Sequence, residues 1–560
     1  MREGSIIKTA AGRHGAAHVG RCHPVMGVRR FRDAEDGGML FFSMVVLLIM
    51  LFIGGMAIDM MRYEAERSRT QATADASVLA AASMRQTRPP ADVVGDWFAK
   101  ADLSGSLTGV VVDNGLNFRS VRAETRTVTK PYFMQMLGIE ELRSNAASTA
   151  EERRTNVEIS LVLDISGSMA GTKMSRLQDA AAEFVTNILG EDTENRVSIS
   201  IVPYNGQVNV GPDLMSRYNV QGRHSYSYCI DLPESTYYQL PLPTSLPMYQ
   251  HADADTFNSS NTSSSWSTSN MTPGSSNIWC PANTTNRVRV HSNNISALTT
   301  QIRNLTAVGA TSIDAGLRWG AAMIDPGSRA MVTSLANAGI VPSTFNGRPF
   351  DYDDEEVLKV IVLMTDGSHW PNEFVNTQYK SGPSPIHRHS DGYYSIYHED
   401  KWGSNKYWVP HRSEWRAVPW SGSSSCYSWS CVSTSTRTPL DWQEVWQRLR
   451  VQWVANQLYR RAMGGSVSGW IDELRSREGT VIGSGPHEVS RMDGRLNSLC
   501  GLLKDQNVAI FGIAFEAPTE GRDVIRNCAS PGRFYDVEGL DISTAFRAIR
   551  AQISALRLTQ

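Results

Sequence analysis

Three separated pieces of the 560-residue sequence place oxygen-bearing side chains where a cation could bind. The pieces are Asp164-Ile-Ser166-Gly-Ser168, Thr311 in the run Gly-Ala-Thr-Ser, and Asp366 in the run Met-Thr-Asp-Gly. Together they offer two carboxylates and three hydroxyls, an all-oxygen donor set of the kind that suits Mg²⁺ or Mn²⁺. Water or a ligand oxygen would complete an octahedron. The residue types therefore predict a hard-cation site, provided that the fold brings the three pieces together.

Local structure offers another explanation for the same residues. Asp164 and Ser166 could cap the helix that follows them, and Asp366 could make a turn. In that case the side chains would satisfy backbone groups and no ion would be needed. The elements expected around the pieces help to choose between the two interpretations.

Apolar runs and amphipathic segments alternate along the body of the chain. Buried strands are predicted at Val157–Leu163, Val197–Val202, Val357–Met364 and Val508–Ala514, and helices at Met174–Leu189, at Asp314–Met323 and from Ile542 onward. This alternation indicates an α/β fold with a mainly parallel sheet and helices on both faces. Ligands bind such sheets at the carboxyl ends of the strands. Each of the three pieces lies at a strand's carboxyl end or a helix's start, which favours the cation site.

Two insertions interrupt this pattern, at about 205–292 and 367–494. Within the first, residues 251–279 contain 17 Ser, Thr or Asn residues, a polar low-complexity stretch. The second holds ten of the 14 tryptophans, including those of a segment with Trp442, Trp446 and Trp453 at helical spacing. We expect these aromatic residues to form a small core of their own. The alternative is a surface that binds carbohydrate or a protein partner.

The spacing of the cation pieces resembles a known family. The D-x-S-x-S motif, a distal Thr and T-D-G, in that order, resemble the metal-ion-dependent adhesion site of von Willebrand factor A (vWA) domains. The resemblance implies a Rossmann-like vWA domain over 155–560, interrupted by the two insertions. It also implies that the metal ligands are Asp164, Ser166, Ser168, Thr311 and Asp366. Ala310 is a departure, since the family often has Gly there.

A single apolar segment near the N-terminus predicts a membrane anchor. Met39–Ile58 is twenty residues long and has Ser43 as its only polar side chain, and a helix of that length spans about 30 Å. Asp59 and Arg62 follow where a signal-peptide cleavage site would be needed, so we read the anchor as uncleaved. The basic residues of the tail, 1–38, favour a cytoplasmic N-terminus. Residues 59–150 are expected to form a helix and a small α+β stalk.

This orientation divides the seven cysteines. Cys22 would lie in the cytosol, and six cysteines would lie in an oxidising compartment, where an even number suits a disulfide framework. Fifteen pairings of six cysteines are possible. Proximity in the sequence favours Cys229–Cys280, Cys426–Cys431 and Cys500–Cys528.

The N-terminal part carries a second resemblance. The anchor, followed by Asp59-Met-Met-Arg62 and by the Ala-rich run 71–81, is similar to the TadE/TadG-like segment of tight-adherence (Flp) pilus assembly proteins. The C-terminal segment, with Cys528 and Phe546, is similar to the end of TadG-type proteins that join this anchor to a vWA domain. The resemblance implies a single-pass protein of the bacterial inner membrane with a periplasmic or surface-directed body.

These features predict a protein-binding function without catalysis. A net charge of −2 argues against a nucleic-acid partner. We expect a scaffold or adhesion component of pilus assembly, in which a partner carboxylate completes the coordination of Mg²⁺. One alternative is a surface adhesin that binds glycan or protein through the aromatic insertion. Another is a periplasmic metal-dependent hydrolase, with His369 as its general base.

Overall fold

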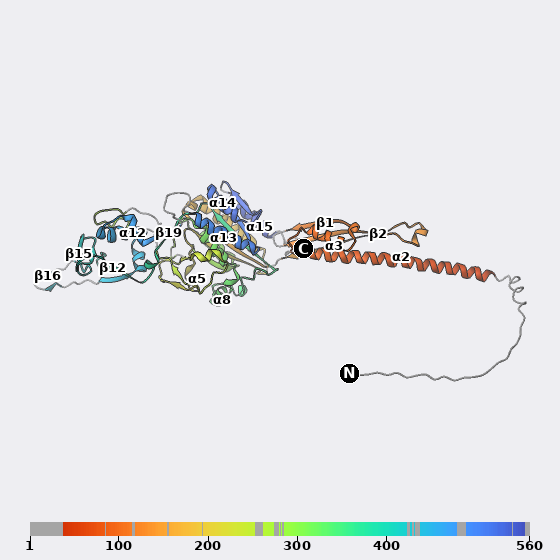
Figure 1. Ribbon diagram of the computed structural model, residues 1–560, viewed down its shortest axis with the longest axis horizontal. Coiled ribbons are helices and arrows are strands. Elements are labelled where there is room, and N and C mark those ends of the chain that lie inside the picture. The colour runs from red at the N-terminus through yellow and green to blue at the C-terminus, as the bar shows by residue number, and fades with distance from the viewer. Residues whose placement is uncertain are drawn as a thin grey trace, which may run out of the picture. The chain divides into compact units, whose positions relative to one another are not determined.

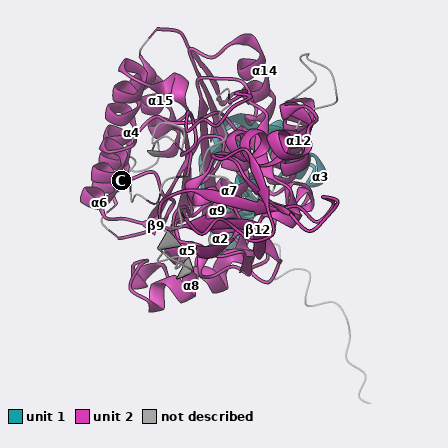
Figure 2. Ribbon diagram, turned by 90° about the vertical axis from the view of Figure 1, so that its left-hand side faces the viewer, with its two compact units in different colours: residues 1–112, 120–151 teal, residues 113–119, 152–560 magenta. Residues whose placement is uncertain are grey.

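The computed structural model divides the chain into two compact units, coloured separately in Figure 2: 1–112 with 120–151, and 113–119 with 152–560. It describes residues 37–83, 86–114, 118–153, 156–192, 194–252, 261–273, 279–280, 282, 285–422, 426–427, 430–431, 437–478, 489–539 and 541–554. The predicted cytosolic Cys22 lies outside these residues. Each unit is described by itself.

The first unit is built on one long helix. Helix α2, Gly37–Ala82, is the red-orange helix of Figure 1, and in the part of the chain that the structure describes it is the one helix long and apolar enough to cross a membrane. Its later turns pack against α3 (Pro90–Lys100) and a sheet of order β1-β2-β3, with bounds Leu107–Asn114, Phe118–Thr129 and Leu142–Arg153. Ala74 and Val78 meet Phe98 and Val121 in a small core. The anchor helix therefore continues into a folded α+β unit.

The second unit is organised around a six-stranded sheet of order β21-β20-β10-β4-β5-β9. The strands are β4 (Asn156–Asp164), β5 (Val197–Tyr204), β9 (Arg289–Ser292), β10 (Val357–Thr365), β20 (Ala509–Phe515) and β21 (Phe534–Val537). All neighbours pair in parallel except β5 and β9, which are antiparallel. From β4 the chain builds outward first on one side and then on the other, which is the doubly wound order.

Helices cover both faces of this sheet because successive side chains of each strand point to opposite sides. Ile159 and Leu161 of β4 face one helical layer, whereas Val162 faces the other. The first layer contains α4 (Thr172–Gly190), α6 (Ile295–Arg303) and α15 (Ile542–Ser554). The second contains α7 (Ile313–Ala322), α8 (Arg329–Asn337), α13 (Ser490–Asp505) and α14 (Thr519–Cys528). The predicted mainly parallel α/β arrangement is present, with one antiparallel edge strand.

The inserted segments share one further core. A sheet of order β15-β14-β13-β12-β18 packs with α9 (Trp442–Arg448) and the turns that follow it. The strands are β12 (Pro383–His389), β13 (Tyr394–Tyr397), β14 (Tyr407–Val409), β15 (Glu414–Arg416) and β18 (Arg437–Asp441). Trp442, Trp446 and Trp453 are buried there, as the sequence predicts. The first insertion contributes Ala252 and Trp266 to the same core, whereas its earlier part, with Leu214 and Met248, packs into the core of the main sheet.

Two of the three favoured disulfides are present. Cys229–Cys280 closes the first insertion, and Cys500–Cys528 joins α13 to α14. Cys426 and Cys431 are paired positions of the hairpin formed by β16 (Cys426–Tyr427) and β17 (Ser430–Cys431). Their side chains lie outside what the structure describes, so that bond stays a prediction.

Candidate functional site

The three cation pieces converge at the carboxyl edge of the sheet, between its two central strands. β4 ends at Asp164, and β10 ends one residue before Asp366. Ser168 Oγ donates to Asp366 Oδ1 at 2.6 Å, and the Oγ atoms of Ser166 and Ser168 are 2.9 Å apart. A Cβ placed on Gly367 would lie 3.4 Å from Thr311 Oγ1 and 3.9 Å from Ser168 Oγ. All five predicted ligands therefore meet in one place.

Asp164 is held firmly in this arrangement. Its Oδ1 accepts the backbone N–H of Ser166 at 2.8 Å, and its Oδ2 accepts the Thr365 hydroxyl at 2.7 Å. The side chain is fully buried. Burial, and then the charge of Asp366, raise the pKa of the Asp164 carboxyl to about 6. Ionised Asp164 thus lacks the full compensation that a buried carboxylate needs.

A lysine supplies part of the missing positive charge. Lys173, in the first turn of α4, places its Nζ 2.8 Å from Asp366 Oδ2 and 3.9 Å from Glu516 Oε2. The Asp366 side chain is fully buried, whereas that of Lys173 is 23% exposed. The ammonium group thus lies beside Asp366 and Glu516, and the buried Asp164 carboxylate has no cation of its own, so the site keeps an attraction for a further cation.

The donor set fits a hard divalent cation. Asp164, Ser166, Thr311 and Asp366 are buried, but Ser168 is exposed, so the cluster opens to solvent on that side. Within the described ranges, no group of three or more His, Cys, Asp or Glu residues is placed to hold a metal ion. A cation here would therefore depend on the three hydroxyls as well as on the two carboxylates. The metal-ligand role of the five residues stays a prediction.

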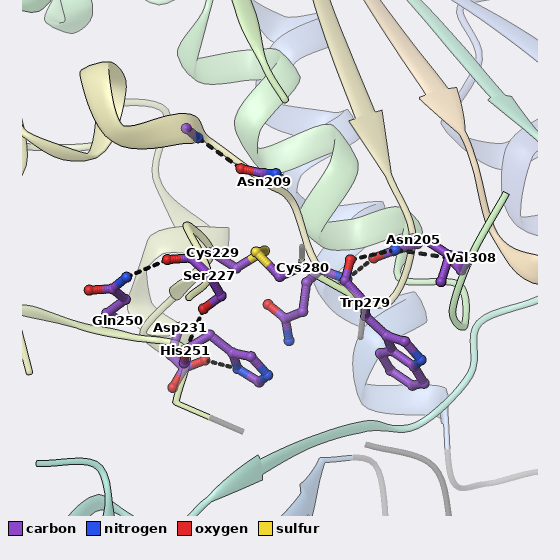
Figure 3. The surroundings of a disulfide bond; sticks show 12 residues. Asn205, Asn209, Ser227, Cys229, Asp231, Gln250, His251, Trp279, Cys280 and Val308 are labelled. Atoms are coloured by element: carbon purple, nitrogen blue, oxygen red, sulfur yellow. Dashed lines mark hydrogen bonds and ion pairs between the residues drawn. A yellow bond between two sulfur atoms is a disulfide. The ribbon is translucent and has the colours of Figure 1, made fainter. Parts of the chain in front are cut away.

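Two residues that the sequence analysis did not single out, Asn205 and Trp279, hold the loop that carries Thr311 in position. Asn205, directly after β5, donates through Nδ2 to the carbonyls of Trp279 (2.8 Å) and Val308 (2.9 Å), as Figure 3 shows. Gly309 has a φ of +87°, and a Cβ there would lie 2.8 Å from the Trp279 ring. Its carbonyl accepts the N–H of Gly167 at 2.8 Å, which ties the Thr311 loop to the Asp164 loop.

The nearby disulfide holds Trp279 in place. Trp279 precedes Cys280, whose bond to Cys229 fixes the segment to the rest of the first insertion (Figure 3). A Cβ on Gly206 would lie 2.3 Å from the same indole ring. The sequence did offer a signal for Asn205, because this residue is polar and directly follows a buried strand. No local pattern pointed to Trp279, because it contacts Gly206, Gly309 and Asn205, which are distant in sequence.

His369, the candidate general base, is buried beside the site. Its Nδ1 lies 2.6 Å from Asp493 Oδ1, and its Nε2 accepts the backbone N–H of Asp314 at 3.1 Å. Both ring nitrogens are therefore engaged in holding α7 and α13. The next residue, Trp370, donates its N–H to the Thr311 carbonyl at 2.8 Å and leaves its side chain 51% exposed. This loop thus presents an indole at the rim of the site.

Comparison with known proteins connects the N-terminal segment to a pilus family. Residues 37–84 match the family model described as Flp pilus-assembly TadE/G-like. The matched segment comprises α2 and the residues that follow it. No match to the sequence is found among curated proteins.

Several solved structures of pilus proteins are similar to the chain. The vWF domain of the type V pili tip protein Mfa5 from Porphyromonas gingivalis is 11% identical, with a TM-score of 0.29, over 72% of this chain and 96% of that chain. The adhesive tip pilin GBS104 from Group B Streptococcus agalactiae is 10% identical, with a TM-score of 0.30, over 71% and 100%.

The pilus adhesin SpaC from Lactobacillus rhamnosus GG is 11% identical, with a TM-score of 0.27, over 80% of this chain and 33% of that chain. The chain thus spans about a third of the length of SpaC. TM-scores this low carry no argument about fold or function. The fold rests on the sheet order, and the site rests on the contacts of its side chains.

Proposed function

We propose that this chain is a membrane-anchored, TadG-type component of tight-adherence (Flp) pilus assembly whose vWA domain binds a protein partner through Mg²⁺ or Mn²⁺. The observation that carries the proposal is the convergence of Asp164, Ser166, Ser168, Thr311 and Asp366 at the open edge of the sheet. The family match of residues 37–84 supports the connection to pilus assembly.

The geometry suits binding through a shared cation. A bound divalent ion would neutralise the two buried carboxylates and offer an open position to a carboxylate of the partner. Exposed Ser168 marks the side from which the partner would approach, and Trp370 supplies an apolar contact at the rim. The contacts of Asn205 and Trp279 keep the Thr311 loop in position before the partner binds. A preformed site of this kind reduces the ordering that binding would otherwise require.

The proposed location is the inner membrane, with the N-terminus in the cytoplasm and the body in the periplasm. Helix α2 supports the anchor, since it has the length and hydropathy of a membrane span. The Cys229–Cys280 and Cys500–Cys528 bonds support an oxidising compartment for the body, because disulfides persist there and are rare in the cytosol.

Metal binding and partner capture test the proposal together. The full chain in detergent is titrated with Mg²⁺ by calorimetry, as wild type, as Asp366→Ala and as the control Asp179→Ala, which alters a largely exposed carboxylate of α4. We expect the heat of binding to disappear only in Asp366→Ala. Membranes of the host are then probed for captured pilus-assembly proteins, with EDTA and after Mg²⁺ is restored. Equal Mg²⁺ binding by all three proteins would contradict the metal site.

The other two functions make different predictions. An adhesin that uses the aromatic insertion is favoured by Trp402, which is 93% exposed, and its ligand capture would survive EDTA but not Trp402→Ala. A hydrolase would need His369 to release one of its two hydrogen bonds, and its turnover would vanish in His369→Gln. Of the nine tryptophans of the insertion that the structure describes, five are buried, which leaves fewer of them for a ligand.

A further inference from the structure

The connection between β2 and β3 presents apolar side chains to the surface. Of the nine residues 131–139, seven are apolar, and charged residues flank them on both sides. The exposed members of this connection are Tyr132 (68%), Met136 (74%), Leu137 (58%) and Ile139 (41%). Exposed apolar clusters of this kind mark contacts with a membrane or with another protein. We call residues 131–139 the apolar loop.

The apolar loop is docked on α2 at the end of the predicted membrane span. A Cβ on Gly55 would lie 2.3 Å from the Phe133 ring, so the glycine makes room for that ring. The Asp59 carboxylate accepts the backbone N–H groups of Tyr132, Phe133 and Met134 at 2.8, 2.6 and 2.9 Å. This contact gives the loop one defined position along the helix.

The docking residues lie on one face of the helix. Gly55, Asp59 and Arg62 follow the spacing i, i+4 and i+7, which brings side chains onto the same side. The Arg62 guanidinium lies 4.1 Å from the centre of the Tyr132 ring. The contacts extend from within the apolar run, which ends at Ile58, to just beyond it, about 10 Å along the helix axis. In Figure 1 the far end of the hairpin that β2 forms with β3 lies alongside α2.

We propose that the apolar loop is a second membrane contact, inserted into the headgroup and upper acyl region of the phospholipid bilayer beside α2. The inference rests on the membrane anchoring in the proposed function. Its support is continuity, because the loop packs on Gly55 and Asp59, where the exposed apolar run of the span ends. Tyr and Arg are residues that favour this boundary, and Lys130, Glu140 and Glu141 would remain in water.

The contact explains two residues that a simple membrane anchor does not require. Asp59 is 1% exposed at the edge of the span, and its charge is compensated by three backbone donors of the loop. Of the two adjacent glycines in the apolar run, Gly55 is the one against which Phe133 packs, whereas a Cβ on Gly54 would meet nothing within 4 Å. With the loop in the interface, the helix would be held at two points, which restrains its tilt and rotation.

Fluorescence quenching at single positions tests the proposal. An NBD label is attached to a cysteine introduced at Met136, Val46 or Leu79 in the full-length Cys22→Ser chain, reconstituted in vesicles of phosphatidylethanolamine and phosphatidylglycerol. Val46 reports on the span, and Leu79 is 67% exposed on the same helix, about 30 Å beyond the span. The unmodified Cys22→Ser chain measures background labelling.

We expect lipid-borne doxyl groups to quench the label at Met136 and Val46, and aqueous iodide to quench it at Leu79. Quenching of Met136 by iodide to the extent seen at Leu79 would overturn the proposal while the anchor stands. Protection of Met136 from both quenchers would also overturn it, since the loop would then be covered by protein. If Val46 itself behaves like Leu79, the membrane anchoring fails, and the inference fails with it.

A substitution at Asp59 tests how the loop is held. In Asp59→Ala the three N–H groups lose their acceptor, so we expect iodide quenching at Met136 to rise towards the Leu79 level. Quenching at Val46 should not change, because the span itself is intact. Unchanged lipid quenching at Met136 in this variant would overturn the proposed docking by Asp59.

Discussion

The two ends of strand β4 carry buried acids that are compensated in different ways. Near its start, Glu158 Oε2 lies 2.5 Å from Lys359 Nζ, and its Oε1 lies 3.8 Å from Arg348 Nη1. Oε1 also accepts the backbone N–H of Phe350 at 3.0 Å. At the other end, Asp164 is paired with hydrogen-bond donors only, and its charged neighbour is another carboxylate.

The difference separates a structural charge cluster from a binding site. At the Glu158 end, one buried carboxylate lies beside two cations, and the charges of Asp325 and Asp192 also act on those cations, so the charges are balanced. At the Asp164 end, Lys173 pairs with Asp366 and not with Asp164, and the cluster is open through Ser168. A buried surplus of one charge is unstable by itself and therefore attracts an external partner of opposite charge. The same pair of strands thus supports a closed end and an open end.

The largest expected effect is at the closed end. Lys359→Ala removes the closest cation from Glu158 and should lower the free energy of unfolding by about 3–5 kcal/mol, because a buried charge is left poorly compensated. Urea unfolding of the full chain in detergent, followed by tryptophan fluorescence, measures the change. Lys173→Ala is the matched control at the open end, where solvent reaches the lysine. Equal losses in both variants would remove the distinction between the two ends.

A dependence on pH should appear at the open end, where the pKa of Asp164 is raised. The pKa of Asp164 is about 6 in the folded chain against 3.8 for the ordinary carboxyl group, so the folded state binds this proton more tightly. Without divalent ions, the free energy of unfolding should therefore fall as the pH rises from about 4 to 6, by at most roughly 3 kcal/mol.

Unfolding in EDTA across this pH range, for wild type and Asp164→Asn, isolates the contribution of Asp164. The difference between the two proteins cancels the titration of all other groups. A difference that stays constant between pH 4 and 6 would contradict the uncompensated state of this carboxyl.

Mg²⁺ should stabilise the wild-type chain by compensating the open end. At a concentration a hundred times the dissociation constant, the gain is about 2.7 kcal/mol. Asp164→Ala should lose this gain, whereas Asp179→Ala should keep it. Thermal unfolding with and without Mg²⁺ at pH 7 provides the measurement, and an equal Mg²⁺ effect in Asp164→Ala would show that the ion binds elsewhere.

The smallest effect concerns the lysine that already occupies the edge of the open end. Lys173→Ala removes an ammonium group 2.8 Å from a carboxylate oxygen, and so removes its repulsion of a divalent ion. We expect Mg²⁺ to bind about tenfold more tightly, or roughly 1.4 kcal/mol. Calorimetric titration at low ionic strength measures the change. Weaker binding in this variant would indicate that Lys173 helps to assemble the site.

Much of the sheet could be predicted because its strands are buried on both faces. Continuous apolar runs such as Val357–Met364 can be recognised locally, and the structure places them in β4, β5, β10 and β20. The short strands β9 and β21 lack such runs and were not predicted. The segment with Trp442 and Trp453 was expected as one amphipathic helix, but it is divided into α9, α10 (Val451–Trp453) and the π-helical turn η9 (Val454–Arg460).

The sequence could predict that the five oxygen-bearing residues meet at one edge of the sheet, but not the contacts around them. Asp164 and Asp366 follow strands, so their location at one edge follows from the parallel arrangement. The surroundings of the site depend on contacts between distant segments: Trp279 packs against Gly309, Lys173 pairs with Asp366, and His369 lies beside Asp493. Hydropathy patterns carry no information about such pairs.

By itself, the sequence determined which segments are buried, where the helix that is apolar enough to cross a membrane lies and which side chains could bind a hard cation. These are local properties, set by hydropathy period and donor chemistry within a few residues. Only the tertiary structure decided that Ser168 meets Asp366 across 198 residues, and that the apolar loop meets Gly55 and Asp59. The physical reason is that packing and charge compensation depend on the three-dimensional neighbours of each group, which a single chain does not reveal along its length.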